Sequence, residues 1–124
     1  MIVSTLLETG LVVPNYVAPA ASWDALNSHT LTVPADKKWF LIGGQVTRDA
    51  AETLVITITD GTNTILTILN AGAAAQTDPF PNSTLMGNMI VPIPLMEGYE
   101  IVFTFGGNQG AGAAISCMVV EVYL

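Results

Sequence analysis

The chain has 124 residues, of which 51% are hydrophobic and only 10% are charged, and its formal net charge at pH 7 is −7. An ordinary soluble domain carries roughly 25% charged residues, so too few charges remain to cover a free surface. The three lysines and arginines are also too few to neutralise a nucleic-acid backbone, and the lone cysteine excludes both an internal disulfide and a multi-cysteine metal site within one chain.

Three kinds of protein have so apolar a composition: a membrane protein, an aggregating chain, and a subunit covered by copies of itself or by a larger assembly. A transmembrane helix needs about 20 mostly apolar residues in a row, and here every apolar run is soon broken by Thr, Pro, Gly or Asn. The first residues, "MIVSTLLETGLVVP", lack the basic start and the long apolar centre of a secretory signal. We therefore expect a single-domain, self-associating subunit that is made and used without export.

Strands are predicted wherever threonines and β-branched residues recur with period two. In chain order, the predicted strands are "ETGLVV", "TLTV" before Pro34, "WFLIGGQVT", "LVITITD", "TILTILN", "MIVPIPL" near residue 90, "IVFTF" and "AISCMVVEVYL". The Ala-rich stretches "APAAS", "AGAAAQ" and "GAGAA" are too short for a stable helix and are flanked by Gly or Pro. About eight strands separated by turns predict an all-β antiparallel sandwich or barrel.

The alternation also predicts which side chains face the core. These are Leu54, Ile56 and Ile58 in one strand and Ile101, Phe103 and Phe105 in another. The irregular stretches Pro14 to Ser28 and Ala71 to Asn88, together with "GGNQGAG" from Gly106, are expected to form loops at the ends of the sandwich.

Candidate catalytic groups are few. His29 is the only histidine, so a Ser–His–Asp relay would have to recruit Ser28, Ser22 or Asp24, and neighbours in sequence seldom present that geometry. We expect His29 to hydrogen-bond or cap the backbone before a strand. Cys117 lies in an apolar strand, where a cysteine is expected to be a small buried core residue.

Two carboxylate pairs suit glycoside chemistry by residue type, and they are Asp49 with Glu52 and Glu97 with Glu100. A sugar site also needs aromatic walls and a cleft, so solvated turns are the favoured interpretation. "DGTN" at residues 60–63 offers oxygen ligands for Ca²⁺ but lacks the full series of a calcium loop, and a hairpin turn explains it. We expect no catalytic residue, no cofactor and no metal.

The closing strand is apolar on both faces, with Ile115, Cys117 and Val119 on one and Met118, Val120 and Val122 on the other. A strand with one wet face alternates with polar residues, so this strand is expected to be covered by the core on one side and by a neighbouring subunit on the other. Glu121 is expected near the rim, solvated or facing a cation of another chain.

Four segments together resemble the small jelly-roll proteins of tailed bacteriophage particles: "LTVPADKKWFLIGGQVTRDA", "LVITITDGTN", "VPIPLMEGYEIVFTF" and "ISCMVVEVYL". In that family a "VPA" turn leads into a Trp-containing strand, a Gly follows an acidic residue before the penultimate strand, and an apolar strand closes the chain. The resemblance covers roughly residues 30–124. Residues 1–29 match nothing in the family and are expected to be an N-terminal arm or the first strands.

The resemblance implies a jelly roll similar to tumour necrosis factor and a homotrimeric decoration, or cement, protein. Such a protein sits on the outer capsid surface of a virion assembled in the host cytoplasm and clamps the major capsid protein. A head-fibre or tail component is the alternative within the virion. A carbohydrate- or ligand-binding jelly roll is the alternative from another class, with a hydrolase third, and an exposed Trp23 beside Asp24 and Asn27 would favour the binding module.

The three cations of the chain, Lys37, Lys38 and Arg48, flank one predicted strand. The lysines are expected in a tight turn, where solvated charge prevents stray edge pairing, and Arg48 is expected to end the strand beside Asp49. Their role is either solubility or a cationic patch that meets an acidic capsid surface or a neighbour's carboxylates. The predicted interface residues are Lys37, Lys38, Arg48, Met118, Val120 and Val122.

Overall fold

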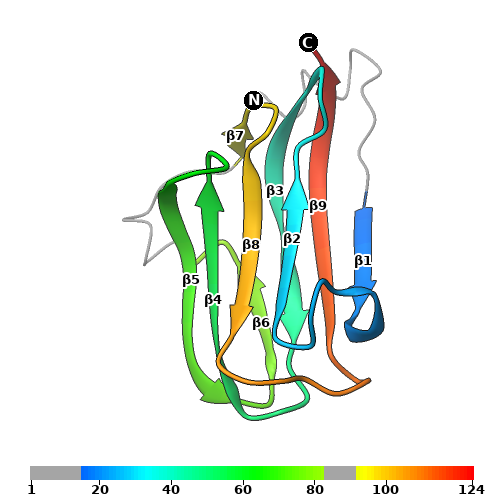
Figure 1. Ribbon diagram of the computed structural model, residues 1–124, viewed down its shortest axis with the longest axis vertical. Helices are drawn as coiled ribbons and strands as arrows, with labels where there is room; N and C mark the ends of the chain where they lie inside the picture. The colour runs from blue at the N-terminus through cyan, green and yellow to red at the C-terminus, as the bar shows by residue number, and fades with distance from the viewer. Residues whose placement is uncertain (1–14, 83–91) are drawn as a thin grey trace.

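The computed structural model describes residues 15–82 and 92–124, which form two antiparallel sheets packed face to face (Figure 1). A five-stranded sheet contains β1 (Asn15–Pro19), β3 (Lys37–Thr47), β6 (Thr77–Phe80), β7 (Ile93–Leu95) and β9 (Ala114–Tyr123). A four-stranded sheet contains β2 (Ser28–Thr32), β4 (Glu52–Thr59), β5 (Thr64–Ala74) and β8 (Glu100–Phe105). The short 3-10 helix η1 (Ala20–Ser22) follows β1.

The strand order is β1-β9-β3-β6 in one sheet, with β7 also paired to β3, and β2-β8-β4-β5 in the other. Most successive strands therefore cross from one sheet to the other, which is the connectivity of a jelly roll. β6 and β7 pair with different halves of β3, at residues 44–47 and 39–41, so these two strands share one position in the sheet. The predicted antiparallel sandwich is confirmed, with nine described strands in eight positions.

Two regions predicted to be irregular contain strands. β1 and η1 lie within the stretch Pro14 to Ser28, and the end of β5 and all of β6 lie within Ala71 to Asn88. Of "MIVPIPL", the described residues place Ile93–Leu95 in β7. The predicted strand "ETGLVV" and residues 83–91 lie outside the described residues.

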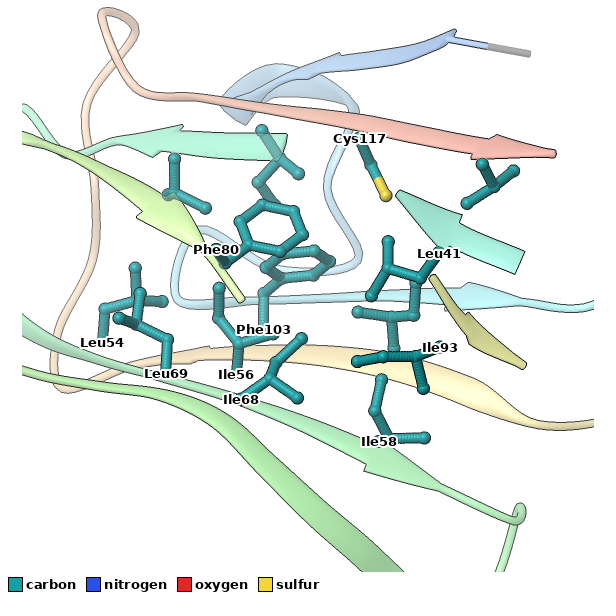
Figure 2. Close-up of a cluster of buried hydrophobic side chains, with 14 of the residues drawn as sticks. Leu41, Leu54, Ile56, Ile58, Ile68, Leu69, Phe80, Ile93, Phe103 and Cys117 are labelled. Carbon is teal, nitrogen blue, oxygen red and sulfur yellow. The ribbon is translucent and has the colours of Figure 1, made fainter. Parts of the chain in front are cut away.

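The core lies between the sheets and consists of side chains from both inner faces (Figure 2). All six residues predicted to face it are buried: Leu54, Ile56, Ile58, Ile101, Phe103 and Phe105. Phe80 of β6 packs edge-on against Phe103 of β8, with ring centroids 5.5 Å apart, so one aromatic contact links the two sheets. Gly44 leaves room for this ring, because a Cβ there would lie 2.7 Å from Phe80 Cζ.

β3 contains a bulge between Leu41 and Gly43, where its register against β9 shifts by one residue. Gly43 has a φ of +150°, a backbone conformation that side chains rarely adopt. Bulges bend a strand and change the direction of its neighbours. The bulge lies in the middle of the five-stranded sheet, between the part of β3 that pairs with β7 and the part that pairs with β6.

Candidate interaction face

Three of the four carboxylates proposed for chemistry accept hydrogen bonds within the chain, and they are those of Asp49, Glu97 and Glu100. Asp49 accepts from the backbone N–H groups of Gly110 at 2.6 Å and Gly112 at 2.8 Å. The buried Gln109 accepts from the N–H groups of Asp49 and Ala50, each at 3.1 Å. The loop "GGNQGAG" is therefore tied to residues 49–50, and Asp49 stabilises this connection.

The second pair, Glu97 and Glu100, is directed at two different partners. Glu97 Oε2 accepts from the backbone N–H of Asp36 at 2.7 Å, and Glu100 Oε1 accepts from the hydroxyl of Thr59 at 2.9 Å. An open depression beside Glu97 is lined by Thr32, Val33, Pro34, Ala35, Glu97 and Gly98. Because Glu97 already binds the neighbouring turn, the depression presents no pair of free carboxylates.

The "DGTN" segment is a hairpin turn, as predicted. Asp60 Oδ1 accepts from the backbone N–H groups of Asn63 at 2.7 Å and Thr62 at 2.9 Å, and these hydrogen bonds lower the pKa of Asp60. Within residues 15–82 and 92–124, no group of three or more His, Cys, Asp or Glu side chains is placed to hold a metal ion. The turn oxygens therefore organise their own backbone.

His29 hydrogen-bonds the backbone, as predicted. Its Nδ1 accepts from the N–H of Asp24 at 3.3 Å, and the Asp24 carboxylate accepts from the N–H of Thr30 at 2.9 Å. Ser22, one of the two candidate serines, donates to the carbonyl of Pro19 at 2.8 Å. Asp24 and His29 thus shape the loop that leads into β2, and Ser22 serves a different turn.

Trp23 is buried, with 7% of its surface exposed. Its ring stacks on Phe105 at a centroid distance of 4.8 Å, and its Nε1 donates to the carbonyl of Ala18 at 2.7 Å. The exposed aromatic platform that a sugar-binding module needs is therefore absent at Trp23. Cys117 is also buried, as predicted, and burial raises the pKa of its thiol to about 12.

Arg48 does not lie on the surface, so the predicted cationic patch of Lys37, Lys38 and Arg48 is wrong. Arg48 is 2% exposed, and its guanidinium donates to the carbonyls of Glu52 and Gly72 and to Asp78 Oδ2, the last at 2.6 Å. It follows the far end of the 11-residue strand β3 from the two lysines. A buried charge needs a partner of opposite sign, and the Asp78 carboxylate on β6 supplies it.

The lysines begin β3 rather than occupying a turn, and Lys37 is paired within its own chain. Its Nζ lies 2.9 Å from Glu121 Oε1, while Trp39 Nε1 donates to Glu121 Oε2 at 2.8 Å. Burial raises the pKa of Glu121, but the hydrogen bonds from Lys37 and Trp39 outweigh it and leave that pKa lowered. Lys38 Nζ lies 5.0 Å from the centre of the Phe40 ring. The cation predicted for Glu121 therefore comes from the same chain.

The outer face of the five-stranded sheet is almost without charge. Residues paired across neighbouring strands point to the same face of a sheet. The residues that alternate with the core-facing ones along each strand, together with their cross-strand partners, therefore form the outer face. Across β1, β3, β6, β7 and β9 it includes Val17, Lys38, Phe40, Gln45, Thr47, Pro79, Pro94, Ala114, Ser116, Met118, Val120 and Val122. Among the outward residues of the described strands in this sheet, Lys38 alone carries a charge.

The outer face of the four-stranded sheet is different because it carries many hydroxyl groups, beside Val55 and Val102. Its outward residues include Thr30, Thr32, Thr57, Thr59, Glu100 and Thr104. A sheet with one solvated face shows this kind of polar alternation. The two outer faces of the sandwich therefore differ in chemistry. The outer face of the five-stranded sheet is the face that water solvates poorly.

The β3 bulge opens a hollow on the poorly solvated face. Its lining consists of Ile42, Gly43, Gly44, Gln45, Ser116 and Met118. Val17 on the adjacent part of the sheet is 66% exposed and Met118 is 41% exposed. We call the surface formed by Val17, Met118 and this hollow the uncharged face. The sequence did not predict a role for Val17 or the presence of the hollow. The only signal for the hollow was the "IGG" inside a predicted strand, because glycines in a strand are typical of a bulge.

The predicted interface residues of β9 have different positions. Met118 is exposed, Val122 is half-buried, and Val120 is fully buried within the single chain. The expectation that Val120 lies on an exposed interface is therefore wrong. Val120 pairs with Phe40, which is also buried, and both lie outside the main core cluster.

No helix in the described part of the chain has the length and apolar character needed to cross a membrane.

No protein-family model matches the chain, and no curated protein matches it in sequence. One solved structure that does match is the core of Drosophila NLP, described in terms of that protein's pentamer formation and histone binding. It shares 12% sequence identity with a TM-score of 0.43, and the match covers 89% of this chain and 97% of the other. A likeness this distant carries no functional argument.

Proposed function

We propose that this chain is a non-enzymatic structural subunit, a homotrimeric decoration protein that binds and stabilises the outer shell of a tailed-phage capsid. The observation that carries the proposal is the uncharged face on a chain whose net charge is −7. Exposed apolar patches mark interaction sites. On this interpretation, the chain has few charged residues because part of its surface is covered by a protein partner.

The remaining polar groups support a structural role. Asp49, Asp60, Glu97 and Glu100 bind backbone or hydroxyl groups of neighbouring segments, and Glu121 binds Lys37 and Trp39. A catalytic site needs a nucleophile or base that is free to meet a substrate. Asp49, Glu97 and Glu100, which were proposed for such roles, instead fix loops and strand ends.

The partners in this proposal are other copies of the chain and the major capsid protein, and the place of action is the virion surface. The resemblance to jelly-roll phage proteins favours a capsid position, and the same features suit a head-fibre or tail component. A carbohydrate-binding module has less support because Trp23 is stacked against Phe105 inside the subunit.

Two measurements test the proposal. Light scattering of the purified chain at micromolar concentration is expected to give the mass of a trimer. Co-sedimentation with phage capsids that lack their decoration protein is expected to pull the chain into the pellet and to raise the temperature at which the capsids open. Capsids whose decoration sites are already filled are the control, and they should bind none. A stable monomer, or a chain that stays in the supernatant with both capsid preparations, would contradict the proposal.

A further inference from the structure

We infer that the uncharged face is the contact between copies of this chain, and that Val17 of one copy inserts into the hollow at Gly43 and Ser116 of the next. The inference rests on the proposed function, because it assumes that the chain works as an assembled subunit. It goes further by assigning the contact to named residues.

Charge favours a second copy at this face. Each copy carries a net charge of −7, so two copies repel wherever their acidic surfaces meet. The outer face of the four-stranded sheet carries Glu100, whereas the uncharged face carries no ionised group. Two identical acidic subunits can bring their uncharged faces together without burying a like-charge pair.

Shape gives a second reason for the same occupant. An apolar projection, Val17 at 66% exposed, and an uncharged hollow that includes Gly43, Ser116 and Met118 lie on one face of the same sheet. Gly43, which pairs with Met118 on this face, supplies backbone without a side chain at this point. Every copy presents both the projection and the hollow, so in a closed ring each copy can give Val17 to one neighbour and receive that of the other.

The edges of the five-stranded sheet make strand-to-strand pairing a poor alternative. Pro19 lies in the edge strand β1, Pro79 in β6 and Pro94 in β7. Proline has no N–H to donate to a neighbouring strand, and natural edge strands use it to prevent pairing. Assembly through the face of this sheet is thus favoured over assembly through its edges.

A cysteine pair tests the contact directly. Val17 and Gln45 both pair with Ser116, from opposite sides, so they stand two strands apart in one subunit. Two strand spacings are about 10 Å, which is too far for a disulfide within the chain. The Val17→Cys/Gln45→Cys variant is therefore expected to form covalent multimers between copies under mild oxidation, seen on a non-reducing gel.

The matched control is Thr30→Cys/Thr57→Cys on the other outer face. Both positions pair with Val102, so they have the same two-strand separation. This variant is expected to remain a single chain on the gel. Covalent multimers in equal yield from both variants would overturn the inference, because they would indicate random collision.

A charge in the hollow gives an independent readout in solution. Ser116→Lys is expected to weaken the assembly about 100-fold or more, because a lysine buried at the contact finds no carboxylate there. Thr57→Lys is the control and should keep the wild-type mass, while circular dichroism checks that both variants fold. If folded Ser116→Lys keeps the wild-type mass, the inference fails.

These outcomes separate the inference from the proposed function. Loss of assembly in Ser116→Lys, with wild-type chain that binds no capsid, supports the subunit contact and contradicts the capsid role. Capsid binding by the wild type, together with an unchanged mass for Ser116→Lys, supports the capsid role and overturns the contact.

Discussion

Arg48 and Asp78 form an ion pair inside the sandwich, with Arg48 Nη2 2.6 Å from Asp78 Oδ2. The Arg48 side chain is fully buried, and that of Asp78 is 13% exposed. Gln76 donates to the other carboxylate oxygen at 2.7 Å, so both oxygens of Asp78 have partners. The pair joins the end of β3 to β6 and the carbonyls of Glu52 and Gly72, which places one cation at the junction of both sheets.

Removing the carboxylate leaves the guanidinium buried without its counter-charge. We expect Asp78→Ala to lower the free energy of unfolding by about 3–5 kcal/mol, since breaking a buried pair leaves an uncompensated charge. Urea denaturation measures the change. The control is Asp36→Asn at an exposed turn position with a φ of 62°, which asparagine tolerates. An Asp78→Ala protein as stable as Asp36→Asn would show that Arg48 reaches water.

Acid sensitivity is expected from Glu121. Its pKa is lowered in the folded chain, since the hydrogen bonds from Lys37 and Trp39 outweigh the effect of burial. A carboxylate whose folded pKa is depressed stabilises the fold above its unfolded pKa, and that stability is lost as pH falls through the folded value. Between about pH 5 and pH 3, the melting temperature of Glu121→Gln should therefore fall less than that of the wild type.

Lys37→Met is the companion to this measurement, because it removes the cation and keeps the carboxylate. It should also reduce the acid-dependent loss. If wild type, Glu121→Gln and Lys37→Met give parallel curves, the Lys37–Glu121 pair does not contribute to acid sensitivity.

A metal chelator is expected to leave stability unchanged. Asp60 Oδ1 already accepts from the N–H groups of both Thr62 and Asn63. Removal of a bound ion would lower the melting temperature by mass action, whereas EDTA should shift it by less than about 1 °C here. A larger drop that added Ca²⁺ reverses would identify a calcium site that involves this turn or another part of the chain.

Strands were predicted correctly where their side chains alternate clearly between apolar and polar. β4 and β8 alternate because one face packs on the core, as Ile56 and Phe103 do, while the other faces water. β1 and β6 were missed because each is a short edge strand that contains a proline, Pro19 or Pro79. An edge strand needs hydrogen bonds on one side only, so it tolerates proline, and the sequence signal for a strand weakens.

The site was less accessible to sequence reasoning, because it depends on contacts between distant segments. Arg48 was expected at the surface because its partner Asp78 lies 30 residues away. Likewise, the apolar second face of β9 was visible, but the sequence does not distinguish the exposed Met118 from the buried Val120. The hollow depends on a bulge in β3 opposite β9, and such a register shift appears only when both strands are in place.

Cys117 should be unreactive in the folded chain. Burial raises the pKa of its thiol to about 12, and the thiolate is the reactive form. We expect Ellman's reagent at pH 8 to label no thiol in native protein and one thiol per chain in concentrated urea, because the sequence contains a single cysteine. Rapid labelling without denaturant would mean that β9 separates from β3 in solution.

The burial of Val120 predicts a different outcome for two substitutions on the same strand face. Val120→Asp places a carboxylate where the chain leaves no exposed surface, which should destabilise the subunit itself by about 3 kcal/mol or more. Met118→Asp lies two residues away at a 41% exposed position. There the charge stays solvated in the single subunit, so the fold should survive while the assembly dissociates. Urea denaturation and light scattering separate the two effects, and a Val120→Asp variant that unfolds at the wild-type urea concentration would contradict the burial of Val120.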